Sequence, residues 1–311
     1  VKLLRKIWNV QQFIIKTIGD KKPEKADLIE IDKWILTKYS KLMKRSTEKM
    51  EKFDYSQTMK EIEYFLWHEL ADHYIEMIKT SIYENKNTKS IKYTLYQLGL
   101  GTLKLFAPFF PHITEEIYNS FYKKFEEEKS IHLSLWPSDI IIDNKSEKSG
   151  EKVKEYISQV RDWKSNKGIA LNVDIDVIAT YASKKFIDNI KRSDFIIKST
   201  LKYPNNHKFI VGKPKVEEKI TKIKPVFSKI GPKLKSEGKK LVDWIQQNNK
   251  QIIKTLDSEG DIILSDISII KTDLKEKLLK DGYIQVEKEV NVKGKTSHIL
   301  SFDDFYLEIK N

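Results

Sequence analysis

The 311-residue chain contains no cysteine, only six histidines and no long apolar run. Without cysteine it forms neither a disulfide nor a thiolate metal site, which fits a reducing, cytoplasmic location. The histidines lack ligand spacing, so no metal is expected. Without about 18 consecutive apolar residues no transmembrane helix and no membrane partner are expected. The chain begins at Val1 without a signal-peptide pattern, which indicates a fragment that starts within a domain.

Glycine is also scarce, at 11 residues, and none are grouped as in a phosphate-binding loop. The paired carboxylates Glu115 and Glu116 stand where a helix is expected to begin, and the helix dipole explains them there. No Ser-His-Asp set follows from residue order alone. We therefore predict no catalytic, cofactor-binding or metal-binding residues in this chain.

Lysine is abundant and unevenly distributed. The formal net charge is +12, and residues 202–240 alone hold 12 Lys and three Glu. Such a region suits a polyanion such as RNA, although solubility in a lysine-rich protein is the alternative explanation. Aromatic residues are few there, so base stacking is not indicated. The candidate phosphate contacts in this half are Lys213, Lys215, Lys222, Lys224, Lys229, Lys233 and Lys235.

Hydrophobic periodicity predicts a helical first part. Helices are expected over 1–18, 26–52 and 90–106, with Gly19 ending the first and Pro111 starting a later one. Asp32 is expected near a helix start, orienting backbone amides, and Asp54 as an N-cap. The stretch 65–79 predicts a helix with a polar stripe of His68, Asp72, Glu76 and Lys79. Phe65 falls next to this stripe and breaks the separation of apolar and polar residues. Trp8 and Phe13 are expected in the core.

The second part predicts a mixture of helices and strands. Residues 130–137 alternate and are expected to be extended, and the polar stretch 138–150 is expected to separate the domains. A helix over 151–167 places Arg161 and Lys164 on one face, as phosphate contacts or as a solvated surface. The remaining predictions are strands over 174–181, 217–227, 282–292 and 296–309, a turn at Gly231-Pro232, a hairpin at Lys293-Gly294, and helices over 184–191 and 241–256. Pro225 predicts that the strand over 217–227 lies at the edge of its sheet. Phe302, Phe305, Leu307 and Ile309 are expected in the second core.

Several motifs identify a family. The string FLWHELADHYIEMIK over 65–79 closely resembles a segment of the anticodon-binding helical domain of valyl-tRNA synthetase, a class I aminoacyl-tRNA synthetase. The matching residues are Trp67, Asp72, Tyr74, Ile75, Glu76 and Lys79. Isoleucyl relatives tend to replace the Asp-x-Tyr-Ile-Glu block, so the match favours valine. Ala71 stands where many bacterial members have cysteine, which favours the archaeal branch.

Other segments carry the same resemblance. Residues 4–14 resemble the segment that joins the catalytic core to the helical domain, with Arg5, Trp8, Asn9 and Phe13 matching. Residues 107–118 resemble the double Pro-Phe signature of these domains, with His112 and Tyr118 as departures. Segments over 160–175 and 223–245 are similar to the archaeal-type C-terminal region. The resemblance is specific over 1–137, moderate over 150–240 and weak beyond.

The resemblance implies an all-α helical bundle over 1–140, followed by a smaller, basic α+β domain over 150–311. It implies a tRNA-binding and anticodon-recognising part of an enzyme that joins valine to its tRNA with ATP. The His-Ile-Gly-His-type and Lys-Met-Ser-Lys-Ser-type motifs of the catalytic domain, and the editing domain, are missing, so this fragment is expected to be inactive alone. Its expected partners are the valine-acceptor tRNA and the catalytic domain of the same parent chain. The candidate RNA contacts in the helical part are Lys2, Arg5, Asn9 and Lys79. Two alternatives are the isoleucyl counterpart and a helical protein-interaction scaffold.

Overall fold

The computed structural model contains two units, and each combines two stretches of the sequence. The first unit is Val1–Asp176 with Ser183–Phe209, and the second is Val177–Ala182 with Ile210–Asn311. The residues that the structure describes are 2–138, 141–204, 206–227, 230, 238–250, 252–253, 284–292 and 297–310. The units differ from the predicted domains 1–140 and 150–311, because a helix after residue 143 packs on helices of the N-terminal part.

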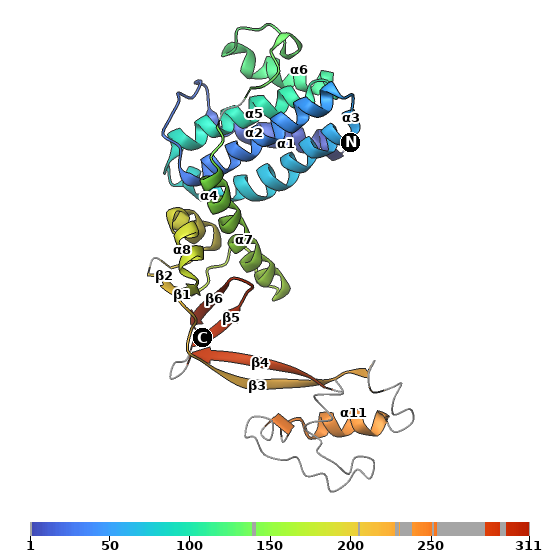
Figure 1. The fold of residues 1–311 in the computed structure, drawn as a ribbon, viewed down its shortest axis with the longest axis vertical. Coiled ribbons are helices and arrows are strands. Elements are labelled where there is room, and N and C mark those ends of the chain that lie inside the picture. Colours follow the sequence, from blue (N-terminus) through green and yellow to red (C-terminus); the bar gives the residue numbers. More distant parts are fainter. Residues whose placement is uncertain are drawn as a thin grey trace. The chain divides into compact units, whose positions relative to one another are not determined.

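The first unit is helical (Figure 1). Its α-helices are α1 (Lys2–Ile18), α2 (Glu30–Glu51), α3 (Tyr55–Tyr64), α4 (Glu76–Tyr83), α5 (Thr88–Phe106), α6 (Pro111–Ser120), α7 (Asn144–Asn166), α8 (Lys184–Ile190) and α9 (Asp194–Leu201). A π-helical stretch, η1 (Phe65–Ile75), joins α3 to α4, and short 3₁₀ turns are η2 (Tyr122–Lys124), η3 (Ile131–Leu133) and η4 (Lys191–Ser193). Helices α1, α2 and α5 run side by side. The helices predicted over 1–18, 90–106 and 184–191 are confirmed.

Helix α1 shows how the sequence produces these elements. Its apolar residues recur at helical spacing, and Ile7, Val10, Ile14 and Ile18 are buried. Gly19 follows at φ +78°, a left-handed conformation that suits glycine at the end of a helix. A side chain from α5 also binds this end, because Lys92 Nζ donates to the carbonyl oxygen of residue 18 at 3.1 Å.

Two predicted caps have different outcomes. Asp54 is the N-cap of α3 and accepts a hydrogen bond from the amide of Gln57 at 3.3 Å, as predicted. Asp32 is not a cap, because it is fully buried and accepts hydrogen bonds from Ser90 Oγ and, at 2.7 Å, from Tyr74 Oη. Helix α2 begins at Glu30, later than predicted, so Asp32 lies in its first turn and points into the core.

The burial of Asp32 predicts a distinctive pH dependence. Burial raises the pKa of Asp32 to about 6 from its ordinary 3.8, although the hydrogen bonds from Ser90 and Tyr74 oppose this shift. Between these values the folded protein binds more protons than the unfolded chain, so stability rises as the pH falls. From pH 7 to pH 5 this carboxyl is expected to add about 1 kcal/mol to the free energy of unfolding.

Urea titrations at pH 5, 6 and 7 measure this contribution. The variant Asp32→Asn should lack the gain at low pH, whereas Asp162→Asn, an exposed change on α7, should keep it. Identical pH profiles for the wild type and Asp32→Asn would contradict the assignment.

A regular α-helix is predicted over 65–79, but its first part, Phe65–Ile75, is the π-helix η1. In a π-helix each amide bonds to the carbonyl five residues earlier, so the angular spacing of side chains changes. Phe65 is therefore buried, although the α-helical wheel placed it beside the polar stripe, and Trp67 is only half-buried. Glu69 is also buried, although the predicted helix placed it neither on the apolar side nor in the polar stripe.

Two predictions between 130 and 150 are wrong. Residues 130–137 are not a strand, because Ser130 caps a 3₁₀ turn and Glu115 accepts hydrogen bonds from its hydroxyl at 2.8 Å and from the amide of Ile131 at 3.1 Å. The predicted linker instead contains the start of α7, where Asp143 accepts from the amides of residues 145 and 146, each at 3.0 Å. Gly150 lies within this helix, against the ring of Trp34.

The second unit is built on a mostly antiparallel sheet of six described strands. Its strands, in the spatial order β2-β1-β6-β5-β4-β3, are β1 (Val177–Ala182), β2 (Lys208–Val211), β3 (Val216–Pro225), β4 (Ile284–Val292), β5 (Ser297–Ser301) and β6 (Phe305–Lys310), with helix α11 (Gly238–Gln247) packed on β3. Strand β3 lies at the edge, as Pro225 predicted. Phe305 and Leu307 are buried in this unit, whereas Phe302 and Ile309 are partly exposed. The turns predicted at Gly231-Pro232 and Lys293-Gly294 lie outside the described residues. The broad prediction, helices followed by an α+β part, is confirmed.

Candidate nucleic-acid interface

Helix α1 presents a face that carries positive charge and no acid. The helix contains Lys2, Arg5, Lys6 and Lys16 but neither Asp nor Glu. Residues three and four apart share one side of a helix, so the polar residues opposite the buried face form a single row. We call this row the α1 stripe: Lys2, Arg5, Asn9, Gln12 and Lys16, all exposed. Three of the residues predicted to contact RNA thus lie together.

Lys6 lies beside the α1 stripe and is held by η1. Its Nζ is 3.3 Å from Asp72 Oδ1 and 4.3 Å from the centre of the Trp67 ring. His68 Nδ1 lies 3.3 Å from the other oxygen of Asp72. The charge of Lys6 is therefore neutralised locally. Within the described residues no carboxylate pairs with the cations of the α1 stripe.

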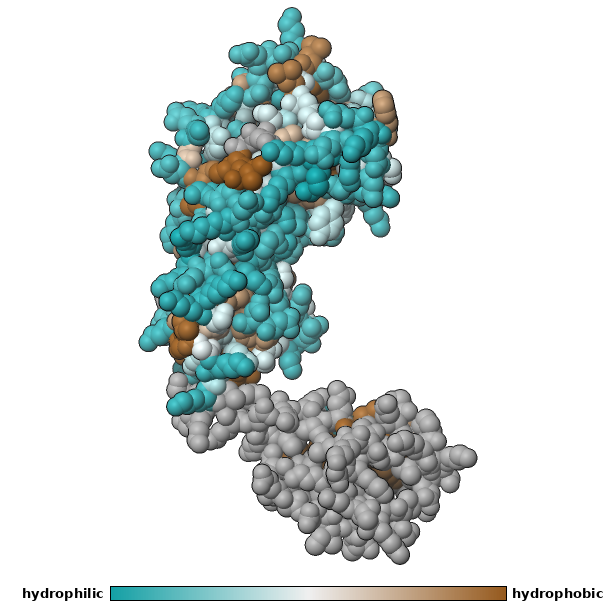
Figure 2. Space-filling view, viewed as in Figure 1, coloured by the Kyte–Doolittle hydropathy of each residue, from teal (hydrophilic) through white to brown (hydrophobic). Residues whose placement is uncertain are grey.

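An exposed aromatic side chain accompanies the α1 stripe. Trp8 on the same helix is 40% exposed, although the sequence predicted core packing for it. An accessible indole beside positive charge can stack on an unpaired base, which is a common way to bind single-stranded nucleic acid. Figure 2 shows that hydrophilic residues cover most of the described surface on the face drawn, with hydrophobic residues in separate patches.

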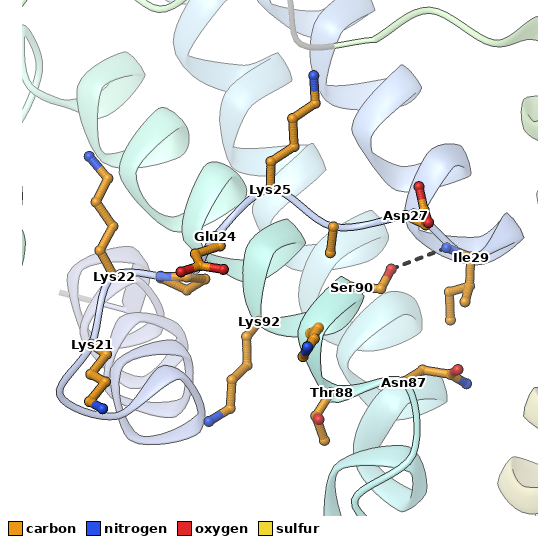
Figure 3. A pocket seen from close by; sticks show the side chains of 13 residues that line it. Lys21, Lys22, Glu24, Lys25, Asp27, Ile29, Asn87, Thr88, Ser90 and Lys92 are labelled. Atoms are coloured by element: carbon orange, nitrogen blue, oxygen red, sulfur yellow. Dashed lines mark hydrogen bonds between the residues drawn. The ribbon is translucent and has the colours of Figure 1, made fainter.

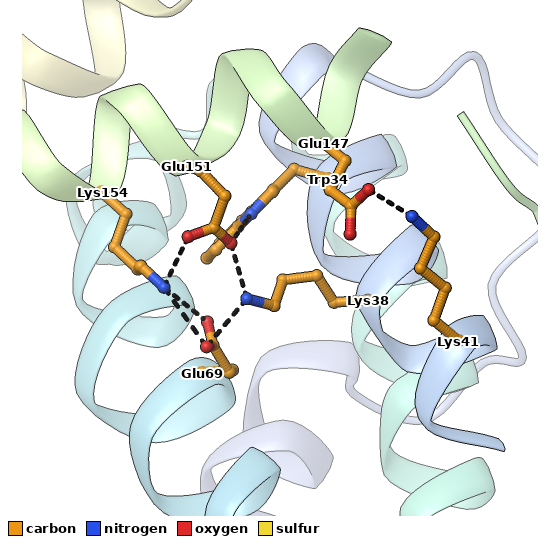
Figure 4. A network of polar contacts seen from close by, with 7 residues as sticks. All are labelled: Trp34, Lys38, Lys41, Glu69, Glu147, Glu151 and Lys154. Atoms are coloured by element: carbon orange, nitrogen blue, oxygen red, sulfur yellow. Dashed lines mark hydrogen bonds and ion pairs between the residues drawn. The ribbon is translucent and has the colours of Figure 1, made fainter. Parts of the chain in front are cut away.

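A network of ion pairs connects α2, η1 and α7 (Figure 4). The buried carboxylate of Glu69 accepts from Lys38 Nζ at 2.8 Å and from Lys154 Nζ at 3.2 Å. Glu151 accepts from Lys38 Nζ at 2.5 Å and from Trp34 Nε1 at 2.9 Å, and pairs with Lys154 at 2.8 Å. Burial alone would raise the pKa of Glu151, but the bonds from Lys154 and Lys38 lower it to about 2. These lysines therefore serve the fold, with little charge left for a ligand.

Lys79 and Arg161 share one carboxylate. Lys79 Nζ pairs with Glu76 Oε1, and Arg161 Nη2 lies 3.9 Å from Glu76 Oε2. Glu76 follows Glu69 by seven residues, and Arg161 follows Lys154 by seven residues. Because Glu69 pairs with Lys154 and Glu76 with Arg161, α7 runs alongside η1 and α4 in the same direction. Both predicted RNA contacts are half-buried and partly neutralised, unlike the cations of the α1 stripe.

Lys164 is not a phosphate contact, and the structure contradicts this prediction. The residue is fully buried, and its Nζ donates to the carbonyl oxygens of Leu171 at 3.3 Å, Val173 at 2.7 Å and Leu201 at 3.3 Å. The carbonyl of Leu201 belongs to the last residue of α9 and would otherwise lack a helical partner. Lys164 thus fastens the segment after α7 and the end of α9 to α7.

The lysines predicted in the second unit have different positions. Lys213, Lys215 and Lys224 are exposed. The backbone of Lys222 pairs with that of Glu287 in the register of β3 with β4, and Lys219 pairs with Glu289. Strand β4 therefore brings acids opposite part of the basic region, which counting charges along 202–240 could not show. Lys229, Lys233 and Lys235 lie outside the described residues.

Sequence reasoning missed a concave site at one end of the first unit. A cleft of about 980 Å³ lies between the α1–α2 connection and the start of α5. The loop with Lys21, Lys22 and Lys25 was visible in the sequence, but its proximity to Lys89 and Lys92 requires the fold. Among the described residues, no group of three or more metal-binding side chains comes together, and no helix has the length and apolarity needed to cross a bilayer.

Comparison with known proteins defines the class of the helical unit. Residues 32–179 match the family model described as the anticodon-binding domain of tRNA ligase. The match begins near the start of α2, continues through α7 and ends in β1.

Particular relatives match over most of the chain. The chain is 36% identical over 268 residues to the valine–tRNA ligase of Pyrococcus furiosus, which covers 84% of this chain and 30% of that protein. It is 33% identical over 310 residues to the ligase of Pyrococcus horikoshii, and this match covers 97% of this chain and 34% of that protein. With the ligase of Methanococcus maripaludis it shares 33% identity over 279 residues, and this match covers 83% of this chain and 30% of that protein. The chain spans about a third of the length of these relatives. The predicted resemblance to the C-terminal part of an archaeal-type valyl-tRNA synthetase is confirmed.

Proposed function

We propose that this chain is the tRNA-holding part of a valine–tRNA ligase and that the helical unit binds the anticodon stem and loop. The family match over residues 32–179 carries this proposal. Joining valine to tRNA with ATP would be performed by another part of the same protein. The partners are accordingly a valine-acceptor tRNA and the catalytic domain of the parent chain.

The α1 stripe supports a specific mode of binding. A row of cations without acids can follow a phosphate backbone, because each Lys or Arg that meets a phosphate releases a bound counterion. The row from Lys2 to Lys16 spans about 21 Å at the helical rise of 1.5 Å per residue. Phosphate contacts of this kind would position the RNA, while unpaired bases would be read on their edges or stacked on a ring such as Trp8. The exposed lysines Lys213, Lys215 and Lys224 of the second unit would add affinity elsewhere on the same RNA.

Charge reversal on the α1 stripe tests the proposal. The variant Arg5→Glu should weaken binding of a valine-acceptor tRNA about 10-fold and reduce the dependence of log K on log salt by about one. Filter binding at several salt concentrations measures both quantities. The matched control is Lys185→Glu, an exposed lysine on α8, which should leave both nearly unchanged.

Nuclease footprinting locates the contact on the RNA. We expect protection of the anticodon stem and loop, and weaker binding when the anticodon is changed. Salt-independent binding, or equal affinity for tRNA, heparin and an acidic protein, would argue against the proposal and favour a general interaction scaffold.

A further inference from the structure

The lysine-lined cleft has the chemistry of a second anion-binding surface. Its lining includes Lys21, Lys22, Lys25, Lys89 and Lys92 and two acids, Glu24 and Asp27. Figure 3 shows that the labelled side chains come from the α1–α2 connection and from the start of α5, which are far apart in the sequence. Positive side chains outnumber carboxylates five to two, so the cleft is positively charged overall.

Two of the lysines hold the walls of the cleft together. Lys92 Nζ donates to the carbonyl oxygen of Ile18 at 3.1 Å, and Lys22 Nζ donates to the carbonyl of Phe125 at 3.0 Å and pairs with Glu126 at 2.9 Å. These bonds join the cleft to the last turn of α1 and to the segment after α6. The walls are therefore fixed by groups that a ligand does not need to displace.

The other three lysines are exposed at the rim. Lys21, Lys25 and Lys89 form no ion pair with any of the described residues. Figure 3 shows the side chains of Lys21 and Lys25 extending in different directions from their loop. Divergent ammonium groups do not enclose one small anion, but they suit an extended chain of negative charges. A polymer of phosphates therefore fits the cleft better than a single phosphate.

The cleft also continues the α1 stripe. Lys16 is the last cation of that stripe, and α1 ends two residues later at Ile18, where Lys92 binds. The last cation of the α1 stripe therefore lies within one helical turn of the helix end that Lys92 binds. We propose that the cleft binds the phosphate backbone of the same RNA as the α1 stripe, as a second contact region next to it. This inference rests on the proposed function.

A triple variant tests the cleft while preserving its walls. In the 311-residue chain, Lys21→Ala, Lys25→Ala and Lys89→Ala together should weaken tRNA binding about 10-fold near 0.1 M salt and lower the salt dependence by about two. Lys22 and Lys92 are kept because they bind backbone carbonyls. An unchanged thermal unfolding curve shows that the variant is folded. The matched control replaces three exposed lysines on other elements, Lys123, Lys148 and Lys185, by alanine.

A gain of affinity gives a second test that misfolding cannot imitate. Replacing the two acids of the cleft with amides, Glu24→Gln and Asp27→Asn, should tighten tRNA binding a few-fold because repulsion of phosphates is removed. Inorganic pyrophosphate at the same ionic strength should not displace the RNA from the wild type.

The outcomes separate this inference from the proposed function. If Arg5→Glu weakens binding while neither cleft variant changes it, the cleft proposal fails and the proposed function stands. If the wild-type chain shows no preference for tRNA at all, the proposed function fails. Displacement by pyrophosphate would mean a small-anion site, which would overturn the assignment of an RNA backbone.

Discussion

Replacing Lys164 with methionine is expected to lower the free energy of unfolding by roughly 4 kcal/mol. Methionine keeps most of the side-chain volume but removes the ammonium that donates to the carbonyls of Leu171, Val173 and Leu201. Hydrogen bonds from a charged donor contribute about 1.5 to 3 kcal/mol each, and buried acceptors left without a donor are costly. Removing the buried charge itself offsets part of this loss. Chemical denaturation at neutral pH measures the result.

Lys164→Met is also expected to change how the free energy of unfolding depends on pH at high pH. Burial lowers the pKa of Lys164 below its ordinary 10.5, so between the folded value and 10.5 the unfolded chain binds more protons. Wild-type stability should therefore contain a contribution that rises with pH in that window, and Lys164→Met should lack it.

A neighbouring lysine provides the control for Lys164. Lys167→Met changes an exposed residue at the end of the same helix and should alter stability by less than about 0.5 kcal/mol. The folded Lys164→Met protein should bind tRNA with wild-type affinity and the same salt dependence. Equal stability of the two variants, or a specific loss of tRNA affinity in Lys164→Met, would contradict the structural role.

Replacing Gly150 with alanine is expected to destabilise the protein by about 3 kcal/mol. A Cβ at this position would lie 2.1 Å from Cγ and 2.4 Å from Cβ of Trp34, which is fully buried. Neither the rigid indole nor the helix backbone can move without separating α7 from α2. At an exposed helical site the same change would stabilise by about 1 kcal/mol, so the sign of the effect is diagnostic.

Thermal and urea unfolding of Gly150→Ala measure that sign. Lys148→Ala, an exposed change in the first part of α7, is the control and should be within about 0.5 kcal/mol of the wild type. A Gly150→Ala protein as stable as the wild type would mean that α7 does not pack closely on Trp34.

Local patterns were sufficient for much of the helical unit. The spacing of Ile7, Val10 and Ile14 predicted α1 and its buried face, and Pro111 marked the start of α6. Asp54 was recognised as a cap because its partner amide is only three residues away. The family resemblance was also available from residue identities alone, since it depends on strings such as 65–79.

Predictions failed where the deciding partner is distant in the sequence. Asp32 looked like a cap, but Tyr74 and Ser90, contributed by other helices, turn it into a buried acceptor. Lys164 looked like a surface cation, but folding brings the carbonyl of Leu201 to its ammonium group. In both cases the partners that bind the charged group lie far away in the sequence, and only packing removes that group from water.

The sequence by itself determined the helical first part, the strand at the sheet edge, the excess of lysine and the kinship with tRNA ligases. Tertiary structure alone decided which cations remain available to a ligand: the α1 stripe and the cleft rim are exposed, whereas Lys38, Lys154 and Lys164 are engaged inside the protein. The physical reason is that helical periodicity depends on neighbours within a few residues, whereas burial and charge neutralisation depend on groups that folding brings from distant positions.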